Sequence, residues 1–440
     1  MAANPSPLQS LRDELASSST TPPTITIRFA ANANSNASHN TYLGSYSTEA
    51  LHRAERLPRI FPEKPPRPFF PDKPTRSPLY GIPISIKDCF DIAGTVTTCG
   101  SRFYAQHNPP ATKNSWVAQR LLDCGAILTG KTHLHQLAYG VTGENPDYGD
   151  CFQPRDATLL TGGSSSGAAA SVQEGSALAA IGTDTGGSIR IPSALCGLAG
   201  YRTSHRIAHG EERWTGGYHL AQSFDTIGVI FRDLRHAPTL ASAIFDIAPT
   251  PPQTTMRIGY AADDFLHDCE PNVLAAFEAW KQHLAHHGAK LAPAATTFWA
   301  DAPAIYSPIV ASEAATIHRG HFQHFDPVIV ERLVYGASIP AAEMQNLRAR
   351  LQNFRLQMSV LFETFDFLIA PCAPVSKLRA GHDHTDSRKA ILRYTTPASL
   401  AGLPAITLPG EHLGAPMGTG VQLLAAPLQD ASLLAFAANL

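Results

Sequence analysis

GGSSSG at residues 162–167 and GTDTGGSIRIPS at residues 182–193 place serines among glycines at a fixed spacing. A serine hydroxyl attacks a carbonyl only when a base takes its proton and donors meet the oxygen that becomes negative. Glycine lets backbone N–H groups approach such an oxygen closely. A third segment, GIPISIKDCFDIAG at residues 81–94, adds Lys87 within an apolar run. Together the three segments indicate a serine nucleophile supplied with a base.

Ser188 is the predicted nucleophile. It follows Thr185, Gly186 and Gly187. The successive N–H groups of these three residues and of Ser188 form the predicted nest for an oxyanion. Taken alone, the motif also suits a glycine turn that ends in a capping serine. Ser164, 24 residues earlier, is the predicted partner of Ser188, although by itself it would also suit a helix N-cap.

Lys87 is the predicted base. The alternation of residues 82–87 sends the isoleucines to one face of a strand and sends Lys87, with Ser85, to the other. A buried lysine without a carboxylate partner loses its charge readily, because burial disfavours the charged form. The competing interpretation is a salt bridge to Asp88 or Asp91, which would keep Lys87 charged.

The combination of Lys87, Ser164 and Ser188 at these spacings strongly resembles the amidase signature family of Ser-cisSer-Lys hydrolases. The resemblance implies an α/β fold, a single α/β/α domain with a central mixed sheet flanked by helices. It implies that Ser188 forms an acyl-enzyme and that Ser164, after a cis peptide bond, relays a proton to Lys87. The implied reaction is cleavage of the C–N bond of an amide, aryl amide or carbamate, without a metal or an organic cofactor. The match is densest over residues 77–234 and returns weakly over 366–434.

Three departures from the family pattern concern substrate specificity. Ser166 stands where glycine is usual, GYRTSHR occupies residues 200–206, and HGEERWTGGYHL at residues 209–220 replaces a briefer connection. Residues 205–221 are therefore predicted to form a movable wall of the substrate pocket; the alternative is an ordinary surface loop whose aromatic residues pack on the body. The predicted hinges of this wall are Gly210, Gly216 and Gly217. The candidate pocket residues are Tyr139, Gly163, Arg206, Trp214 and Tyr218.

The composition favours a small-molecule partner. The 440-residue chain is 44% apolar with 34 basic against 36 acidic side chains, which leaves no electrostatic footprint for nucleic acid or an anionic membrane. No long apolar run and no secretory signal are readable, so a cytoplasmic location is expected. The seven cysteines lack CxxC spacing and are predicted to be buried thiols, and the histidine clusters are not expected to hold a metal. A homodimer is compatible with this composition.

The order of segments predicts one catalytic domain behind an N-terminal extension. Residues 1–79 combine a helix, a polar connection rich in Asn and Ser, and a proline-rich strap packed on the body. Residues 80–440 form the amidase signature domain, with a catalytic core over 80–234 and a helical and sheet-return region over 235–440.

Periodicity predicts the individual elements. The expected helices are residues 6–17, Ser115–Asp123, Ser166–Glu174 and a long helix from Met344 to Leu361. The expected strands include Ile82–Ile86, Ala126–Gly130 and strand-like pieces in FDFLIAPCAPVS and YTTPASLAGLPAITLPG near the C-terminus. These last pieces are expected to rejoin the sheet of the catalytic core.

Three other functions are weighed. Within the family, the chain could be the glutamine-processing subunit of an amidotransferase that passes ammonia to partner subunits. From another class, GGSSSG could be the phosphate-binding loop of a small-molecule kinase, although GxxxxGK[ST] is absent. A noncatalytic scaffold is disfavoured because Lys87, Ser164 and Ser188 are all present.

Overall fold

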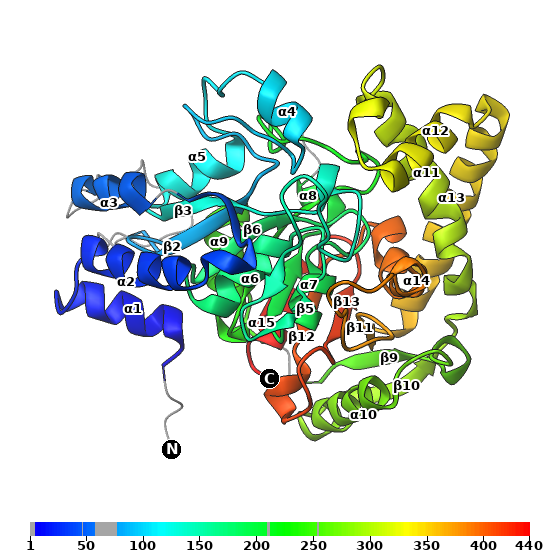
Figure 1. Ribbon diagram of the computed structural model, residues 1–440. Coiled ribbons are helices and arrows are strands. Elements are labelled where there is room, and N and C mark those ends of the chain that lie inside the picture. Colours follow the sequence, from blue (N-terminus) through cyan, green and yellow to red (C-terminus); the bar gives the residue numbers. More distant parts are fainter. Residues whose placement is uncertain (1–4, 46, 58–76, 209–211, 253–254) are drawn as a thin grey trace.

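A mixed sheet of 11 strands runs through the molecule, with helices packed around it (Figure 1). The computed structural model describes residues 5–45, 47–57, 77–208, 212–252 and 255–440. From one edge to the other, the strands are β1 (Tyr42–Ser45), β3 (Ile127–Thr132), β2 (Pro83–Lys87), β6 (Ala179–Thr183), β8 (Ile227–Phe231), β7 (Ala199–Arg202), β12 (Ala405–Leu408), β13 (Val421–Ala425), β11 (Phe367–Pro371), β9 (Arg257–Ala261) and β10 (Lys290–Ala294).

The strand directions are mixed. β2 runs parallel to its neighbours β3 and β6, and β9 runs parallel to β10 and β11. The pairs from β6 across to β11 are all antiparallel, and β1 is antiparallel to β3. Strands β2, β6 and β8 are buried along their whole length, as helices on both faces require. The expected α/β fold with a central mixed sheet is confirmed.

Helices and short turns form the connections between strands. The α-helices are α1 (Pro7–Ala16), α2 (Pro22–Ser35), α3 (Ser47–Arg56), α4 (Arg102–His107), α5 (Trp116–Asp123), α6 (Ser166–Glu174), α7 (Arg190–Leu195), α8 (His205–Ala208), α9 (Ala237–Phe245), α10 (Pro271–His286), α11 (Ala302–Ile317), α12 (Pro327–Ser338), α13 (Ala341–Thr364), α14 (Thr385–Ala401) and α15 (Asp430–Ala437). The 3-10 turns are η1 (Ala37–His39), η2 (Gln136–Ala138), η3 (Leu234–His236), η4 (Asp263–Phe265), η5 (Thr297–Asp301), η6 (Phe322–His324) and η7 (Gly410–Leu413). A separate ribbon pairs β4 (Phe152–Gln153) with β5 (Asp156–Leu160).

Most of the predicted elements are confirmed, and two are wrong. Helices α1, α5, α6 and α13 and strands β2 and β3 lie where periodicity placed them. A polar connection was expected where α2 forms; the Thr21 side chain caps this helix by accepting from the Thr24 amide. Strand-like structure was expected around Pro397, which instead lies inside the buried helix α14. Residues 58–76, most of the expected proline-rich strap, lie outside the described residues.

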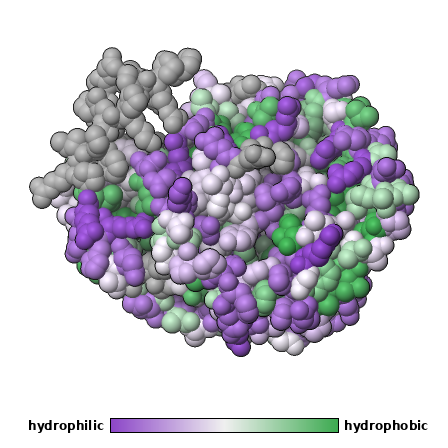
Figure 2. All heavy atoms as spheres, turned by 90° about the horizontal axis from the view of Figure 1, so that it is seen from above, coloured by the Kyte–Doolittle hydropathy of each residue, from purple (hydrophilic) through white to green (hydrophobic). Residues whose placement is uncertain are grey.

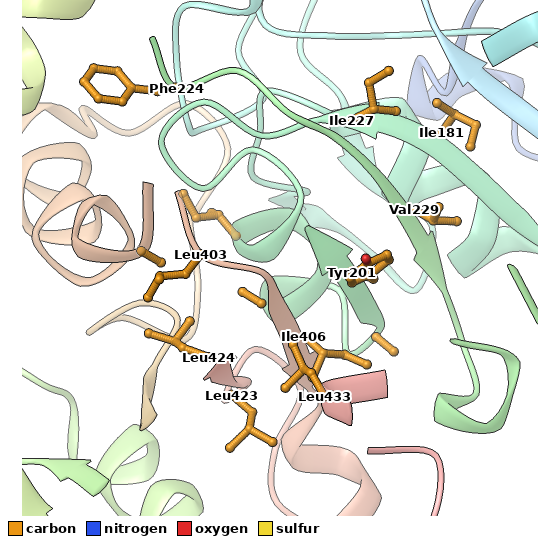
Figure 3. Close-up of a cluster of buried hydrophobic side chains, with 14 of the residues drawn as sticks. Ile181, Tyr201, Phe224, Ile227, Val229, Leu403, Ile406, Leu423, Leu424 and Leu433 are labelled. Carbon is orange, nitrogen blue, oxygen red and sulfur yellow. The ribbon is translucent and has the colours of Figure 1, made fainter. Parts of the chain in front are cut away.

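One core joins the two halves of the chain. Figure 3 shows side chains of both halves in one cluster, with Ile181 and Val229 of the first half at one end, Ile406 and Leu423 of the second half at the other, and Tyr201 between the two groups. The sheet therefore crosses the predicted regional boundaries: β12 pairs with β7, and β1, from the N-terminal extension, pairs with β3. The face drawn in Figure 2 mixes hydrophilic and hydrophobic residues. No described helix has both the length and the apolar composition that a membrane span requires.

Candidate active site

Lys87 ends strand β2 with its amine directed at two hydroxyl groups. The side chain is fully buried, and its Nζ lies 2.8 Å from Ser164 Oγ and 2.8 Å from Thr183 Oγ1. The expected alternation holds, since Ser85 on the same strand bonds the Ser171 hydroxyl on helix α6 at 2.8 Å. Parallel pairing of β2 with β6 brings Thr183 to this position. The sequence did not reveal Thr183 as a partner, because that contact depends on which strands are neighbours.

The expected competitor of this arrangement, a salt bridge to Asp88, is absent. Asp88 pairs instead with Lys131 on β3, with its Oδ1 2.5 Å from Lys131 Nζ. Asp91 accepts a hydrogen bond from the Thr97 hydroxyl. No described carboxylate lies within the 4.0 Å ion-pair distance of Lys87. Burial lowers the pKa of Lys87 from its ordinary value of 10.5, and the more distant carboxylates only partly oppose this shift.

The segment GGSSSG bends sharply beneath Lys87. The Gly163–Ser164 peptide bond is cis, and Ser164 is fully buried. The Ser164 carbonyl accepts from the His135 amide at 3.2 Å and from the Ser166 hydroxyl at 3.3 Å. Ser166, which replaces the usual glycine, therefore bonds back to the serine run where helix α6 begins.

Three buried charged groups brace the loop that carries Ser188. The Asp184 carboxylate accepts from the Gly187 amide at 2.8 Å and receives an ion pair from Arg190 at 3.0 Å. Arg202 donates to the same carboxylate at 2.8 Å. Burial alone would raise the pKa of Asp184, but the two guanidinium groups hold it well below its usual value. The carboxylate therefore stays charged and fixes the loop.

The amides around Ser188 differ in availability. Ser188 is 4% exposed, and its carbonyl accepts from the Ser165 amide at 3.3 Å, which ties the two serine-rich segments together. The Gly187 amide is taken by Asp184, whereas within the described residues the amides of Thr185, Gly186 and Ser188 donate no hydrogen bond. Gly187 has a φ of +123°, and a Cβ there would meet Ile191 and Thr395 within 2.8 Å. Only glycine fits this bend.

Helices α11 and α14 close over the same loop. The Thr395 hydroxyl of α14 donates to the Gly186 carbonyl at 2.5 Å. A Cβ at Gly186 would lie 2.3 Å from the Tyr306 hydroxyl of α11. Neither Tyr306 nor Thr395 was predicted from the sequence, because both come from the helical and sheet-return region and reach the loop only in the folded chain.

The five candidate pocket residues fall into two groups. Tyr139 and Gly163 lie beside the serine run. The Gly163 amide donates to the carbonyl of Val141, which is two residues after Tyr139, and Tyr139 is mostly buried. Tyr218 is 42% exposed, and its amide donates to the carbonyl of Cys89, two residues after the predicted base. The other two lie elsewhere.

Trp214 lies in the hydrophobic core, and Arg206 is exposed at the surface. Trp214 is 6% exposed, packs on Phe90 with ring centroids 6.0 Å apart, and stacks on His219 at 4.1 Å. Arg206 on α8 lines a surface hollow with Glu212, and none of the three predicted catalytic residues lines that hollow. We therefore interpret Trp214 as a core residue.

The segment around Trp214 is held by backbone hydrogen bonds to residues outside it. The Asp91 amide donates to the Gly216 carbonyl at 2.8 Å, and the Trp116 amide donates to the Thr215 carbonyl at 2.9 Å. A Cβ at Gly216 would lie 2.7 Å from the Ser115 backbone, so this predicted hinge glycine permits close packing. Gly210, another predicted hinge, lies outside the described residues.

The cysteines and histidines have structural partners. All seven cysteines are free; six are buried as expected, and Cys269 is half-buried. Within the described residues, no three His, Cys, Asp or Glu side chains converge as a metal site. The histidines at 318–324 gather around aromatic rings, with His324 stacked on Phe103 at 4.2 Å.

Comparison with known proteins places this chain in a defined group. The family model Amidase matches residues 25–434. The chain is 30% identical to AtzE, a 1-carboxybiuret hydrolase subunit of Pseudomonas sp. (strain ADP), over 80% of this chain and 82% of that protein. It is also 30% identical to one of the subunits of glutamyl-tRNA(Gln) amidotransferase of Prochlorococcus marinus (strain MIT 9313), over 81% and 82% of the two chains. A crystal structure of an amidase superposes with a TM-score of 0.85 at 27% identity, covering 98% of both chains.

Proposed function

Because the chain belongs to the amidase (amidase signature) family, we propose that it hydrolyses the C–N bond of a small linear amide or carbamate through a Ser188 acyl-enzyme. The observation that carries this proposal is the buried Lys87 amine, which has no carboxylate partner and lies 2.8 Å from Ser164 Oγ. Lys87 lies on β2, beside strand β6, and the loop that carries Ser188 begins where β6 ends. The family match also removes the kinase alternative.

In the proposed reaction, Ser188 Oγ attacks the carbonyl carbon while its proton passes through the Ser164 hydroxyl to the neutral Lys87 amine. The carbonyl oxygen becomes negative and accepts from the free amides of Thr185, Gly186 and Ser188. As the tetrahedral intermediate collapses, the C–N bond breaks and the same relay returns the proton to the leaving amine. Water then repeats both steps, releasing the acid and restoring the Ser188 hydroxyl.

Two features prepare Lys87 for this role. Its burial favours the neutral amine, whose lone pair is the proton acceptor. The Thr183 hydroxyl holds the amine from a second side at 2.8 Å and so limits the directions in which the Nζ lone pair can point. We propose Thr183 as the positioning residue for the base. The Gly187 amide is omitted from the oxyanion donors, because it already donates to Asp184.

Substitution of the serine pair tests this mechanism. Ser188→Ala is expected to lower kcat by about 10³-fold or more with an unchanged fold, because a methyl group packs like the hydroxyl but cannot attack. Lys87→Ala and the double variant Lys87→Ala/Ser164→Ala are expected to be about equally slow, because the two residues act as one relay. The measurement is ammonia or amine release from aliphatic amides, anilides, carbamates and esters with matched leaving groups. If Ser188→Ala kept a tenth of the activity, Ser165 would become the candidate nucleophile.

Similarity to a component of an amidotransferase favours a second candidate function, release of ammonia from glutamine for partner subunits. The same purified protein distinguishes the two. Hydrolysis of simple amides with no ammonia released from glutamine supports the free-standing hydrolase, whereas the reverse preference supports the amidotransferase function.

A further inference from the structure

Two arginines near the candidate active site lack carboxylate partners. Among the described residues, neither Arg332 of α12 nor Arg388 of α14 lies within the 4.0 Å ion-pair distance of an acidic group. Arg332 donates to the Tyr139 carbonyl at 2.7 Å, and its guanidinium lies 5.3 Å from the centre of the Tyr139 ring. The Arg388 side chain makes no hydrogen bond within the described residues, and its buried Nε has no partner. By contrast, Arg393 on the same helix pairs with an aspartate.

The surroundings of this pair favour an anion. Burial and the charge of Arg388 together lower the pKa of Arg332 to about 10, although the Tyr139 hydroxyl and the carboxylates of Asp326 and Glu331 oppose both effects. Burial likewise lowers the pKa of Arg388, opposed by the hydroxyls of Tyr139 and Tyr306. Two like charges held in partly dry surroundings repel each other, and a carboxylate bound to both would relieve the cost.

The arginine pair lies beside the proposed reaction centre. Helices α11, α12 and α14 form one group on the right of Figure 1. On α14, Arg388 precedes Thr395 by seven residues, which places both on one helix face roughly 10 Å apart along the axis. Thr395 bonds the Gly186 carbonyl of the nucleophile loop. Arg388 therefore lies about two helical turns from that loop.

The electrostatic effects of the two arginines on neighbouring residues also connect them with the serine loops. His135, whose amide donates to the Ser164 carbonyl, has its pKa lowered by burial and further by the charges of Arg332 and Arg388. Arg388 interacts electrostatically with Tyr139 and with Tyr306, whose hydroxyl lies against Gly186. Both lines of evidence connect the arginine pair with the serine loops.

We propose that Arg388, assisted by Arg332, binds a carboxylate on the substrate, so that the preferred substrates are amides or carbamates that carry a second, anionic end. This inference rests on the proposed function of Ser188. A guanidinium group binds a carboxylate through two parallel N–H···O bonds, and burial of its surroundings strengthens them. The number of atoms between the carboxylate and the scissile carbonyl then decides whether that carbonyl reaches Ser188 Oγ.

The test compares monoamides of linear dicarboxylic acids, from succinamate to suberamate, with the neutral diamides of the same lengths. Initial ammonia release gives kcat/KM for each compound. The wild-type protein is expected to prefer one monoamide over its diamide by tenfold or more. Arg388→Gln is expected to remove that preference by raising KM for the monoamide, while the rate on the diamide stays within about twofold and reports an intact site. Lys389→Gln, which removes a charge from the exposed side of α14, is the matched control and should change neither rate.

Each outcome has a defined meaning. Equal rates on monoamides and diamides, or an unchanged preference in Arg388→Gln, overturn the carboxylate site and leave the hydrolase function standing. If the wild-type protein hydrolyses no amide, the proposed function fails, and calorimetry with adipamate then decides the binding site: binding that Arg388→Gln abolishes supports it, and equal or absent binding overturns it. Should Arg388→Gln not fold, Arg388→Lys replaces it, with weaker binding of the monoamide expected because one ammonium cannot form the paired contact.

Discussion

Lys87 and Lys131 show how one sheet gives two buried lysines different states. Lys131 forms an ion pair with Asp88 at 2.5 Å, whereas the Lys87 amine contacts two hydroxyls and no carboxylate. Both are almost fully buried, so exposure does not separate them. Their difference arises from strand alternation, which sends Lys87 and Asp88, although adjacent in sequence, to opposite faces of the sheet.

The state of Lys87 predicts how activity and stability depend on pH. Activity is expected to rise with pH to a plateau, because Lys87 accepts a proton only after losing its own at its lowered pKa. Between that pKa and 10.5, the unfolded chain holds a proton that the folded chain lacks, so each unit of falling pH lowers the wild-type unfolding free energy by about 1.4 kcal/mol. In Lys87→Met this pH-dependent decrease is absent, so the difference in unfolding free energy between the variant and the wild type should shift in favour of the variant as the pH falls. Urea unfolding from alkaline to neutral pH measures this difference. Parallel stability curves would show that Lys87 is charged in the fold.

At the scale of single residues, the sequence was sufficient for groups that share a motif and insufficient for groups that meet across the fold. Lys87, Ser164 and Ser188 were selected by spacing, and the Lys87–Ser164 contact has the expected geometry. Thr183 and Arg388 carry no local signal, since their positions depend on the pairing of β2 with β6 and on the packing of α14. A single sequence does not contain that information in any short window.

Among the structural elements, residues 212–220 differ most from the sequence-based expectation. Glycines beside aromatics suggested hinges, but the glycines serve close contact: Gly217 forms a backbone bridge with Phe90, and a Cβ on it would meet both the Phe90 and Trp214 rings within 3.1 Å. Glycine in a sequence is compatible both with a hinge and with tight packing, so the residue type alone does not distinguish the two. Similarly, Pro397 was expected at the edge of a strand but lies inside helix α14, a position that proline ordinarily disfavours.

Trp214→Ala tests whether this element is fixed. The substitution is expected to lower the free energy of unfolding by about 3–5 kcal/mol, because it leaves a cavity against Phe90 and His219. Rates on bulky and small substrates should fall in proportion. Tyr218→Ala, at an exposed side chain of the same segment, is the control and should change stability by less than about 0.5 kcal/mol. A tenfold change in substrate preference with no change in melting temperature would restore the movable wall.

For the molecule as a whole, buried imidazoles predict sensitivity to acid. Burial lowers the pKa of His133, His236 and His318 to about 4, below the ordinary value of 6.5. They occupy three different regions, and His236 Nε2 accepts from the Leu8 amide at the start of helix α1. As the pH falls from 6.5 towards 4, the unfolded chain therefore binds protons that the folded chain does not.

The unfolding free energy is accordingly expected to fall over this range, by up to about 1.4 kcal/mol per pH unit for each of the three imidazoles. Glu174 opposes part of the loss, because burial raises its pKa to about 7 and the folded chain takes up a proton there first. Denaturant unfolding at a series of pH values measures the slope. In His236→Gln one imidazole's share of the slope should disappear, and an unchanged slope would contradict a neutral His236 in the fold.

The sequence predicted that residues near the C-terminus return to the first sheet, and strands β11, β12 and β13 do so. It did not predict their order, in which β12 pairs with β7 and β11 lies between β13 and β9. Strand order depends on long-range packing that hydrophobic patterns do not encode, because each strand has the same apolar character wherever it is placed.

This strand order has a consequence for the chain as it leaves the ribosome. The strands of residues 83–231 can pair among themselves early, but the free edge of β7 gains its partner only when residues 405–408 have been synthesised. For the intervening stretch of translation, the nascent chain presents an open, apolar strand edge, the kind of surface that recruits chaperones or leads to aggregation. The rate of translation through the helical region therefore sets how long the half-built sheet must be protected.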